Sequence, residues 1–305
     1  MTGAVKLGDF TLERGMRILA PMAGYTDIAF RSLCREHGAA LAATEMVSVR
    51  GKVRNNAATE ALTRIAECER PSCVQLFGNE PEDFARAATE LDCDIIDINM
   101  GCPMPKIVKN GDGAALLLEP ERAGRIVKAI KRVTDRPVTV KTRIGYNIGK
   151  VTAGELIKRV ADAGASLAVV HGRFAEQRYA GASDADAVKA LADKSSLPIV
   201  YNGDVDESNI DELEREFGIV AIGRGALNNP CIFDGGHVSP VDLARRHIEL
   251  LTQYFDERYT VNAARKFFVH YFKGVPGGRA LRESVNRANS VADVQKAVDD
   301  FRNVY

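Results

Sequence analysis

Polar side chains end a series of short apolar runs in the first two thirds of this chain. The run ends are, in chain order, Met22, Glu45, Gln75, Asn99, Lys141, His171, Asn202 with Asp204, and Gly223-Arg224-Gly225. Amide, ammonium, imidazole and guanidinium groups can bind a polar or anionic ligand and can stabilise charge that develops during a reaction. One such residue means little, but the whole series predicts a single ligand site if the runs are neighbouring strands.

Cys102 is the residue of this region whose side chain could donate a proton. It follows the apolar run Ile95–Ile98 and precedes the glycine-rich segment Asn110–Gly113, which could move over a bound substrate. The chain has six cysteines and no CxxC pair, so neither a metal site nor a disulfide framework is expected. A buried cysteine is often only a small apolar side chain, and from the residues alone this alternative stays open for Cys102.

Lys141 and His171 end two further runs. A lysine within a buried strand is costly without an anionic partner, which is either a carboxylate of the protein or a ligand that gains negative charge. A histidine at a strand end is either a structural residue or a ligand contact, and its proximity to Lys141 and Asn202 in the predicted site favours ligand contact. Gly223-Arg224-Gly225 is either a plain turn or a phosphate site, since glycines let the backbone approach a phosphate and the arginine adds a charge.

The apolar runs are short enough for buried parallel strands and alternate with amphipathic helical segments such as Glu121–Val133 and Val151–Ala163. The predicted strands are Ile18–Met22, Ala40–Met46, Cys73–Phe77, Ile95–Ile98, Val138–Lys141, Leu167–His171, Ile199–Asn202 and Val220–Gly223. This order predicts an α/β fold, a (β/α)8 TIM barrel, in which active sites lie at the carboxyl ends of the strands. A doubly wound open sheet is the rival, but Ala20–Gly24 is not its glycine fingerprint.

The segment after the barrel is helical in pattern and contains no predicted strand. We expect a barrel domain over residues 1–235 and a small all-helical domain over residues 236–305. The 305 residues, 46% of them hydrophobic, are enough for such a core. No apolar run could span a bilayer, and Met1–Phe10 does not resemble a signal peptide. We therefore expect a cytoplasmic enzyme without a metal or a membrane partner, and a monomer.

Several segments resemble the tRNA-dihydrouridine synthase family, in its bacterial, FMN-dependent form. In the first half these are Ala20–Asp27, Phe30-Arg31, Thr44–Ser48, Val74–Gly78, Asp97–Pro103 and Gly111–Leu117. They continue with Val140–Arg143, Val170–Arg173, Gln177–Tyr179, Asn202–Asp204, Gly223–Ala226 and the stretch from Ala264-Arg265-Lys266 to Lys273-Gly274. Their order and spacing match along nearly the whole chain. The chain departs from the family pattern in having no tryptophan, which affects loops that dock the substrate.

The resemblance implies an oxidoreductase that reduces the C5=C6 bond of uridines in tRNA. It implies bound FMN, NADPH as the reductant, hydride transfer to uracil C6, and Cys102 as the general acid for C5, with Asn99 holding the uracil. The residues implied to contact FMN or lie beside it are Pro21, Met22, Ala23, Gln75, Lys141, His171, Asn202, Asp204, Gly223 and Arg224. Lys141 would stabilise negative charge on the reduced flavin. Arg173 and Arg178 are the implied tRNA contacts.

A locally basic stretch could hold tRNA although the whole chain has no net charge. The stretch from Arg258 to Arg287 contains seven basic residues and one acidic residue, Glu283. Within it, Arg265 and Lys266 are the predicted tRNA contacts. The interleaved aromatic residues of this stretch are either part of the same surface or the core of the helical domain. Lys106 and Lys109 could add contacts near Cys102.

Two other functions compete with this interpretation. One is an FMN barrel enzyme that acts on a free pyrimidine, such as a dihydroorotate or dihydropyrimidine-type dehydrogenase. The basic helical segment argues against it, because an enzyme with a small substrate has no use for that charge. The other is a non-catalytic tRNA-binding flavoprotein, and the presence of both Cys102 and Lys141 argues against it.

Overall fold

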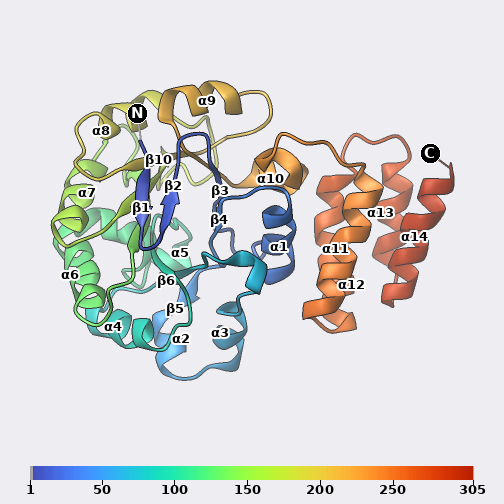
Figure 1. Ribbon diagram of the computed structural model, residues 1–305, viewed down its shortest axis with the longest axis horizontal. Coiled ribbons are helices and arrows are strands. Elements are labelled where there is room, and N and C mark those ends of the chain that lie inside the picture. Colours follow the sequence, from blue (N-terminus) through green and yellow to red (C-terminus); the bar gives the residue numbers. More distant parts are fainter. Residues whose placement is uncertain (1–2, 305) are drawn as a thin grey trace.

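A computed structural model describes residues 3–304, in which a curled sheet of parallel strands is surrounded by helices (Figure 1). The sheet strands are β3 (Arg17–Leu19), β4 (Leu41–Ala42), β5 (Val47–Ser48), β6 (Cys73–Phe77), β7 (Ile95–Met100), β8 (Val138–Gly145), β9 (Leu167–Phe174), β10 (Ile199–Asn202) and β11 (Val220–Ile222). Their order is β4-β3-β11-β10-β9-β8-β7-β6-β5. A parallel bridge from Ala43 to Cys73 joins the β4 side back to β6 and closes the barrel. The predicted TIM-barrel class is confirmed.

The predicted strand Ala40–Met46 is only partly correct. It is divided into β4 and β5, which together occupy one barrel position, since both ends of this segment lie against β6. The strands β8 and β9 run further than predicted, to Gly145 and Phe174. The last residues of these two strands include charged side chains inside the barrel. The apolar pattern in the sequence therefore ends before the strand does.

Amphipathic helices cover the outside of the barrel. They are α1 (Ile28–Glu36), α2 (Val49–Val53), α3 (Ala57–Leu62), α4 (Pro81–Thr89), α6 (Pro120–Lys131), α7 (Ala153–Asp162), α8 (Ala185–Ala192), α9 (Ile210–Phe217) and α10 (Arg224–Asn228), with a short α5 (Pro105–Val108) at the carboxyl end. In α6, Ala123, Ile126, Val127 and Ile130 are buried, as their helical spacing predicts.

Alternate strand residues point into the barrel, where the lower half is apolar. Ile18, Leu41, Cys73, Ile95 and Val200 belong to one buried cluster inside it. A two-stranded hairpin, β1 (Val5–Leu7) and β2 (Phe10–Leu12), adds its apolar side chains to this cluster. The hairpin was not predicted from the sequence. The lower half of the barrel is therefore filled by apolar side chains.

Four helices follow the barrel and lie together at one side of it (Figure 1). They are α11 (Pro240–Tyr254), α12 (Glu257–Tyr271), α13 (Gly278–Arg287) and α14 (Val291–Val304). The bundle packs on α1, where the rings of Phe30 and Phe267 stack with centroids 5.0 Å apart. The expected division at residue 235 falls between the last barrel elements and α11, and it stays a prediction. Within residues 3–304 no helix has the length and apolar character needed to cross a bilayer.

Candidate active site

The register of the parallel strands brings most of the predicted site residues together inside the upper barrel. Adjacent strands pair Gln75 with Asp97, Asn99 with Lys141, and His171 with Asn202. Residues two apart on a strand share a face, so these side chains form layers above the apolar floor. All of them are buried except Lys141, which is partly exposed towards the mouth.

A continuous chain of hydrogen bonds links three of these strands. Thr139 donates to one oxygen of Asp97 over 2.6 Å, and the Gln75 amide donates to the other oxygen over 2.6 Å. The Asn99 amide then donates to Oε1 of Gln75 over 2.9 Å. These side chains have no more than 9% of their surface exposed, so the chain is shielded from water.

The same asparagine holds the segment that carries Cys102. Oδ1 of Asn99 accepts hydrogen bonds from the backbone N–H of Gly101 at 3.2 Å and of Cys102 at 2.9 Å. Burial raises the pKa of the Cys102 thiol, although the nearby cations Arg143 and Lys141 lower it. A protonated thiol at neutral pH is the form required of a proton donor.

Lys141 is the partly exposed cation among these otherwise buried side chains. Burial and the neighbouring Arg143 lower its pKa to about 8, while Asp97 and Cys102 raise it. No hydrogen bond or ion pair of its ammonium group is found among residues 3–304. A direct salt bridge from Lys141 to a carboxylate is therefore absent from the described residues, although the charge of Asp97 acts on the ammonium group.

Two further residues line the same layer. Burial, followed by the charges of Lys141, Arg143 and two more arginines, lowers the pKa of His171 to about 2, so the imidazole is neutral at physiological pH. Arg143 donates to the carbonyl oxygens of Gly101 and Arg178, both at 2.8 Å. It thereby ties the Cys102 segment to the loop after β9.

Asp204 joins two arginines at the opposite side of the mouth. Its carboxylate accepts from Arg173 over 2.8 and 2.5 Å and from Arg224 over 2.9 Å. The Arg173 side chain is 2% exposed and also bonds the carbonyl of Ala180 over 3.2 Å, whereas Arg224 is half exposed. Arg173 is predicted to contact tRNA, but its guanidinium is buried against Asp204 and does not reach the surface. Arg178 is exposed, as a tRNA contact would need.

Two glycines lie close to these residues. A Cβ atom on Gly203 would lie 2.7 Å from the His171 ring, and one on Gly223 would lie 3.7 Å from the sulfur of Met22. Gly223 and Met22, which follow the last and first barrel strands, are therefore neighbours. Asn202 lies in the same wall, where its amide donates to the Ala221 carbonyl over 2.8 Å.

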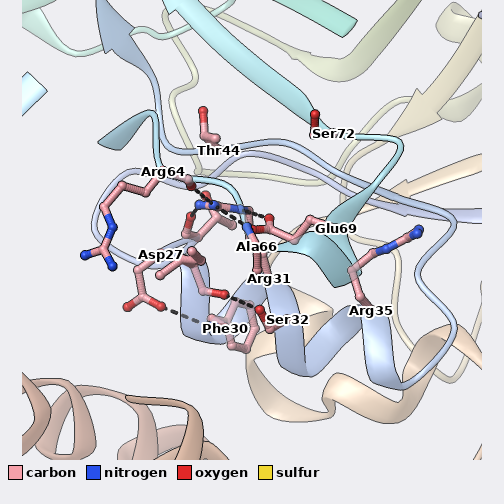
Figure 2. A network of polar contacts seen from close by, with 12 residues as sticks. Asp27, Phe30, Arg31, Ser32, Arg35, Thr44, Arg64, Ala66, Glu69 and Ser72 are labelled. Carbon is pink, nitrogen blue, oxygen red and sulfur yellow. Dashed lines mark hydrogen bonds and ion pairs between the residues drawn. The ribbon is translucent and has the colours of Figure 1, made fainter. Parts of the chain in front are cut away.

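The loop after β3 carries Pro21, Met22 and Ala23 and is held at several points. Figure 2 shows Arg31 of α1 bound to Glu69 and to the carbonyl of Arg64. The same guanidinium donates to the Thr26 carbonyl over 2.7 Å. The Arg31–Glu69 pair is nearly fully buried, so removing either partner would leave an uncompensated charge.

The two predicted tRNA contacts in α12 are bound within the protein. Arg265 donates to the Ala288 carbonyl over 2.6 Å, and Lys266 donates to the Gly24 carbonyl of the loop after β3. The aromatic residues of α12 are largely core, since Phe267, Phe268 and Tyr271 are buried. The exposed cations of this basic stretch are Arg258, Lys273, Arg279 and Arg287.

Three residues of the site were not identified as functional from the sequence: Asp97, Thr139 and Arg143. Their signal was a polar residue at every second position of a strand otherwise made of apolar residues. That pattern places them on the inner face of the barrel. They were missed because only the residues that end the apolar runs were considered as site residues. No cluster of metal-ligating side chains occurs in the part of the chain that the structure describes.

Two curated proteins are similar to this chain over most of its length. A probable tRNA-dihydrouridine synthase of Rhizobium leguminosarum is 35% identical over 274 residues, which covers 85% of this chain and 86% of the relative. The tRNA-dihydrouridine synthase B of Pseudomonas aeruginosa is 33% identical over 303 residues, covering 93% and 91%.

Solved structures show the same fold at low identity. Histamine dehydrogenase from Rhizobium sp. 4-9 has a TM-score of 0.59 at 12% identity, over 81% of this chain and 50% of that one. An old yellow enzyme homologue from Zymomonas mobilis has a TM-score of 0.51 at 12% identity, over 83% and 95%. The family model described as dihydrouridine synthase matches residues 18–304. The family expected from the sequence is thereby confirmed, and the chain belongs to the dihydrouridine synthase family.

Proposed function

We propose that this protein is a tRNA-dihydrouridine synthase that reduces the C5=C6 bond of uridines in tRNA, with FMN as bound cofactor, NADPH as reductant and Cys102 as general acid. The observation that carries the proposal is the Asn99-held Cys102 segment beside the partnerless ammonium group of Lys141, in one buried layer of the barrel. The family membership supports the reaction class.

The residues present fit a flavin mononucleotide. Lys141 lacks a partner among the described residues, and Arg224 supplies a half-exposed cation beside Asp204. A Cβ atom on Gly223 would meet only the Met22 sulfur, at 3.7 Å, so the backbone there is accessible to a phosphate. We assign the ring to Pro21, Met22, Ala23, Gln75, Lys141, His171 and Asn202. We assign the phosphate end to Gly223, Arg224 and the Asp204–Arg173 pair. When bound, FMN supplies the hydride for C6 of the uracil, and NADPH restores it.

Cys102 and Asn99 act on the uracil from the protein side. The Asn99 amide has two hydrogens, one of which bonds Gln75. Its nitrogen also donates to the Met46 sulfur over 3.9 Å, and this weak acceptor is the one that a carbonyl of the base would replace. The Cys102 thiol donates its proton to C5, and the nearby cations Lys141 and Arg143 lower the energy of the thiolate that results. The neutral imidazole of His171 offers a hydrogen bond without adding a third charge.

Exposed cations on two sides of the mouth are proposed to bind the phosphates of tRNA. Lys106 and Lys109 lie just past Cys102, Arg178 lies on the loop after β9, and Lys273 and Arg287 belong to the helical bundle. Phosphate contacts of this kind give affinity that falls with salt. A dehydrogenase for a free pyrimidine would not need them, so tRNA is the better substrate.

The experiment is an assay of purified protein with unmodified tRNA, FMN and NADPH, read by mass spectrometry of nucleosides. Dihydrouridine in the tRNA supports the proposal. Consumption of free uracil or dihydroorotate instead would support the alternative dehydrogenase, and binding of tRNA without any reduction would support the non-catalytic alternative.

A further inference from the structure

The buried chain Thr139–Asp97–Gln75–Asn99 ends on the Cys102 segment and has a direction. A carboxylate only accepts hydrogen bonds, whereas a side-chain amide can turn over and exchange its donor for its acceptor. The residue with no such freedom therefore fixes the orientation of the others. In this chain that residue is Asp97, which accepts from Thr139 and Gln75 over 2.6 Å each.

The orientation passes from one side chain to the next. Because Asp97 requires the NH2 group of Gln75, the oxygen of Gln75 must face Asn99. The Asn99 amide therefore presents its NH2 group to Gln75 and its oxygen to the N–H groups of Gly101 and Cys102. If Gln75 turned over, Asn99 would have to turn as well, and its NH2 group would then oppose two backbone donors.

We propose that Asp97 is a positioning residue that fixes the orientation of the Gln75 and Asn99 amides and thereby holds the backbone that carries Cys102. A catalytic role for this arrangement of amides rests on the proposed function, but the orientation of the amides does not. Three observations carry the inference. The bonds are 2.6–2.9 Å long from Asp97 to Asn99, each member is nearly fully buried, and the chain crosses adjacent strands β6, β7 and β8.

The partnerless cation supports an ionised Asp97. Burial raises the pKa of Asp97, while the hydrogen bonds from Thr139 and Gln75 and the charge of Lys141 oppose that rise. Lys141 lies on β8 next to Thr139 along the inner face, and Cys73 on β6 is the other titratable group affected by this carboxylate. Only Lys141 is cationic, so it is the group that favours the acceptor-only form of Asp97.

The test compares amide hydrogen exchange at Gly101 and Cys102 in full-length variants, with FMN in excess so that cofactor occupancy is equal. Asp97→Asn keeps the size but can donate or accept, so both orientations become available to Gln75. We expect exchange at these two amides to rise about tenfold, as for the loss of roughly one net hydrogen bond. Thr139→Val is the matched control, because it removes one bond to Asp97 and leaves the carboxylate facing Gln75, and it should change exchange less than about twofold.

A second variant makes the direction itself measurable. Asn99→Asp alone places a carboxylate opposite the oxygen of Gln75, so it should lower the melting temperature by about 2–4 °C. In the Asp97→Asn background, Asn99→Asp places the acceptor-only side chain at position 99 instead of position 97. It should therefore raise the melting temperature and restore slow exchange at the Cys102 amide. This change of sign cannot come from general loosening of the barrel, and it stays measurable even if Asp97→Asn alone folds poorly.

The outcomes separate this inference from the proposed function. Unchanged exchange in Asp97→Asn, equal effects of Asp97→Asn and Thr139→Val, or a destabilising Asn99→Asp in both backgrounds would overturn the positioning role. Since none of these measurements requires tRNA or turnover, a protein that shows the expected pattern but forms no dihydrouridine would contradict only the proposed function.

Discussion

Lys266 of α12 donates a hydrogen bond to the carbonyl oxygen of Gly24, in the loop that follows the first barrel strand. The N–H group of Gly24 donates in turn to the Glu45 carboxylate, so both sides of this glycine are bound. The ammonium group also lies 5.0 Å from the ring centroid of Tyr25 and 4.7 Å from that of Phe267. The helical bundle is thereby joined to the loop of Pro21, Met22 and Ala23, which we assign to the cofactor.

Removal of this contact should weaken cofactor binding at a distance. Lys266→Met keeps the length of the side chain but removes the donor to the Gly24 carbonyl and one of the two cations that act on Asp27 and Glu45, the other being Arg31. We expect a loss of stability of about 1–3 kcal/mol in urea denaturation and weaker FMN binding by fluorescence titration. Lys266→Arg retains the charge and is the control. Equal FMN affinity in Lys266→Met and the wild type would contradict the coupling.

Lys141→Met should stabilise the cofactor-free protein while it weakens cofactor binding. The pKa of Lys141 is about 8 in the folded protein and 10.5 as its ordinary value, so between these values the unfolded chain binds more protons. The contribution of Lys141 to stability therefore rises with pH from about 8 to 10.5, and below pH 8 the charged group is a cost. Urea denaturation at pH 7 and pH 10 measures it.

The free energy of unfolding of Lys141→Met should exceed that of the wild type by more at pH 7 than at pH 10. A gain that does not depend on pH would contradict a buried, charged Lys141, and unchanged FMN affinity would remove it from the cofactor site.

Asp204→Asn should destabilise the mouth because it leaves the buried Arg173 guanidinium without its anion. Asp204 has a φ of 49°, a left-handed conformation that asparagine tolerates, so the substitution tests charge alone. We expect a loss of about 1–3 kcal/mol, since the carboxylate is itself partly exposed. Arg224→Gln, which removes the half-exposed partner, should cost less than half as much. Similar costs for both variants would contradict a special role of the buried arginine.

The same carboxylate predicts a pH dependence. Burial raises the pKa of Asp204, but the bonds from Arg173 and Ser183 and the charges of Arg173 and Arg224 outweigh it, so the pKa is lowered. A lowered carboxylate pKa gives stability that is present above the unfolded value of about 3.9 and lost as the pH falls through the folded value. Acid denaturation of the wild type should therefore be steeper below about pH 4 than that of Asp204→Asn.

Exposed cations of the bundle should determine the salt dependence of tRNA binding. Lys273→Ala with Arg287→Ala removes two exposed charges with no ion pair among the described residues, so affinity should fall and the slope of log affinity against log salt should become shallower by roughly one to two. Lys296→Ala is a control, because that lysine pairs with Asp300. A parallel shift of the salt plot, or no change, would place the tRNA elsewhere.

The order of the strands and the residues at their ends could be predicted because buried parallel strands are short apolar runs. The inner face near the mouth could not, since Asp97, Thr139 and Arg143 break the apolar pattern that marks a strand. The partners of Lys266 and Arg173 could not be predicted either. Each reaches a group far away in sequence, Gly24 or Asp204, and only the folded chain brings the two together.

The hairpin β1–β2 shows a different limit. Its strands have three residues each, which is too short for an alternating pattern to stand out. Its role becomes visible only in the barrel, where Val5, Leu7 and Leu12 join the interior cluster. The missing prediction did not affect the site, because the hairpin fills the opposite half of the barrel.

The proton-donor role of Cys102 can be measured in the dihydrouridine content of cellular tRNA. Cells from which the gene has been deleted receive a gene for either the wild type or Cys102→Ala, and dihydrouridine is quantified in their tRNA. The FMN content of both purified proteins is also measured. We expect that the wild type restores dihydrouridine and that Cys102→Ala binds FMN equally but restores almost none. Full restoration by Cys102→Ala would contradict the assignment of Cys102 as the general acid.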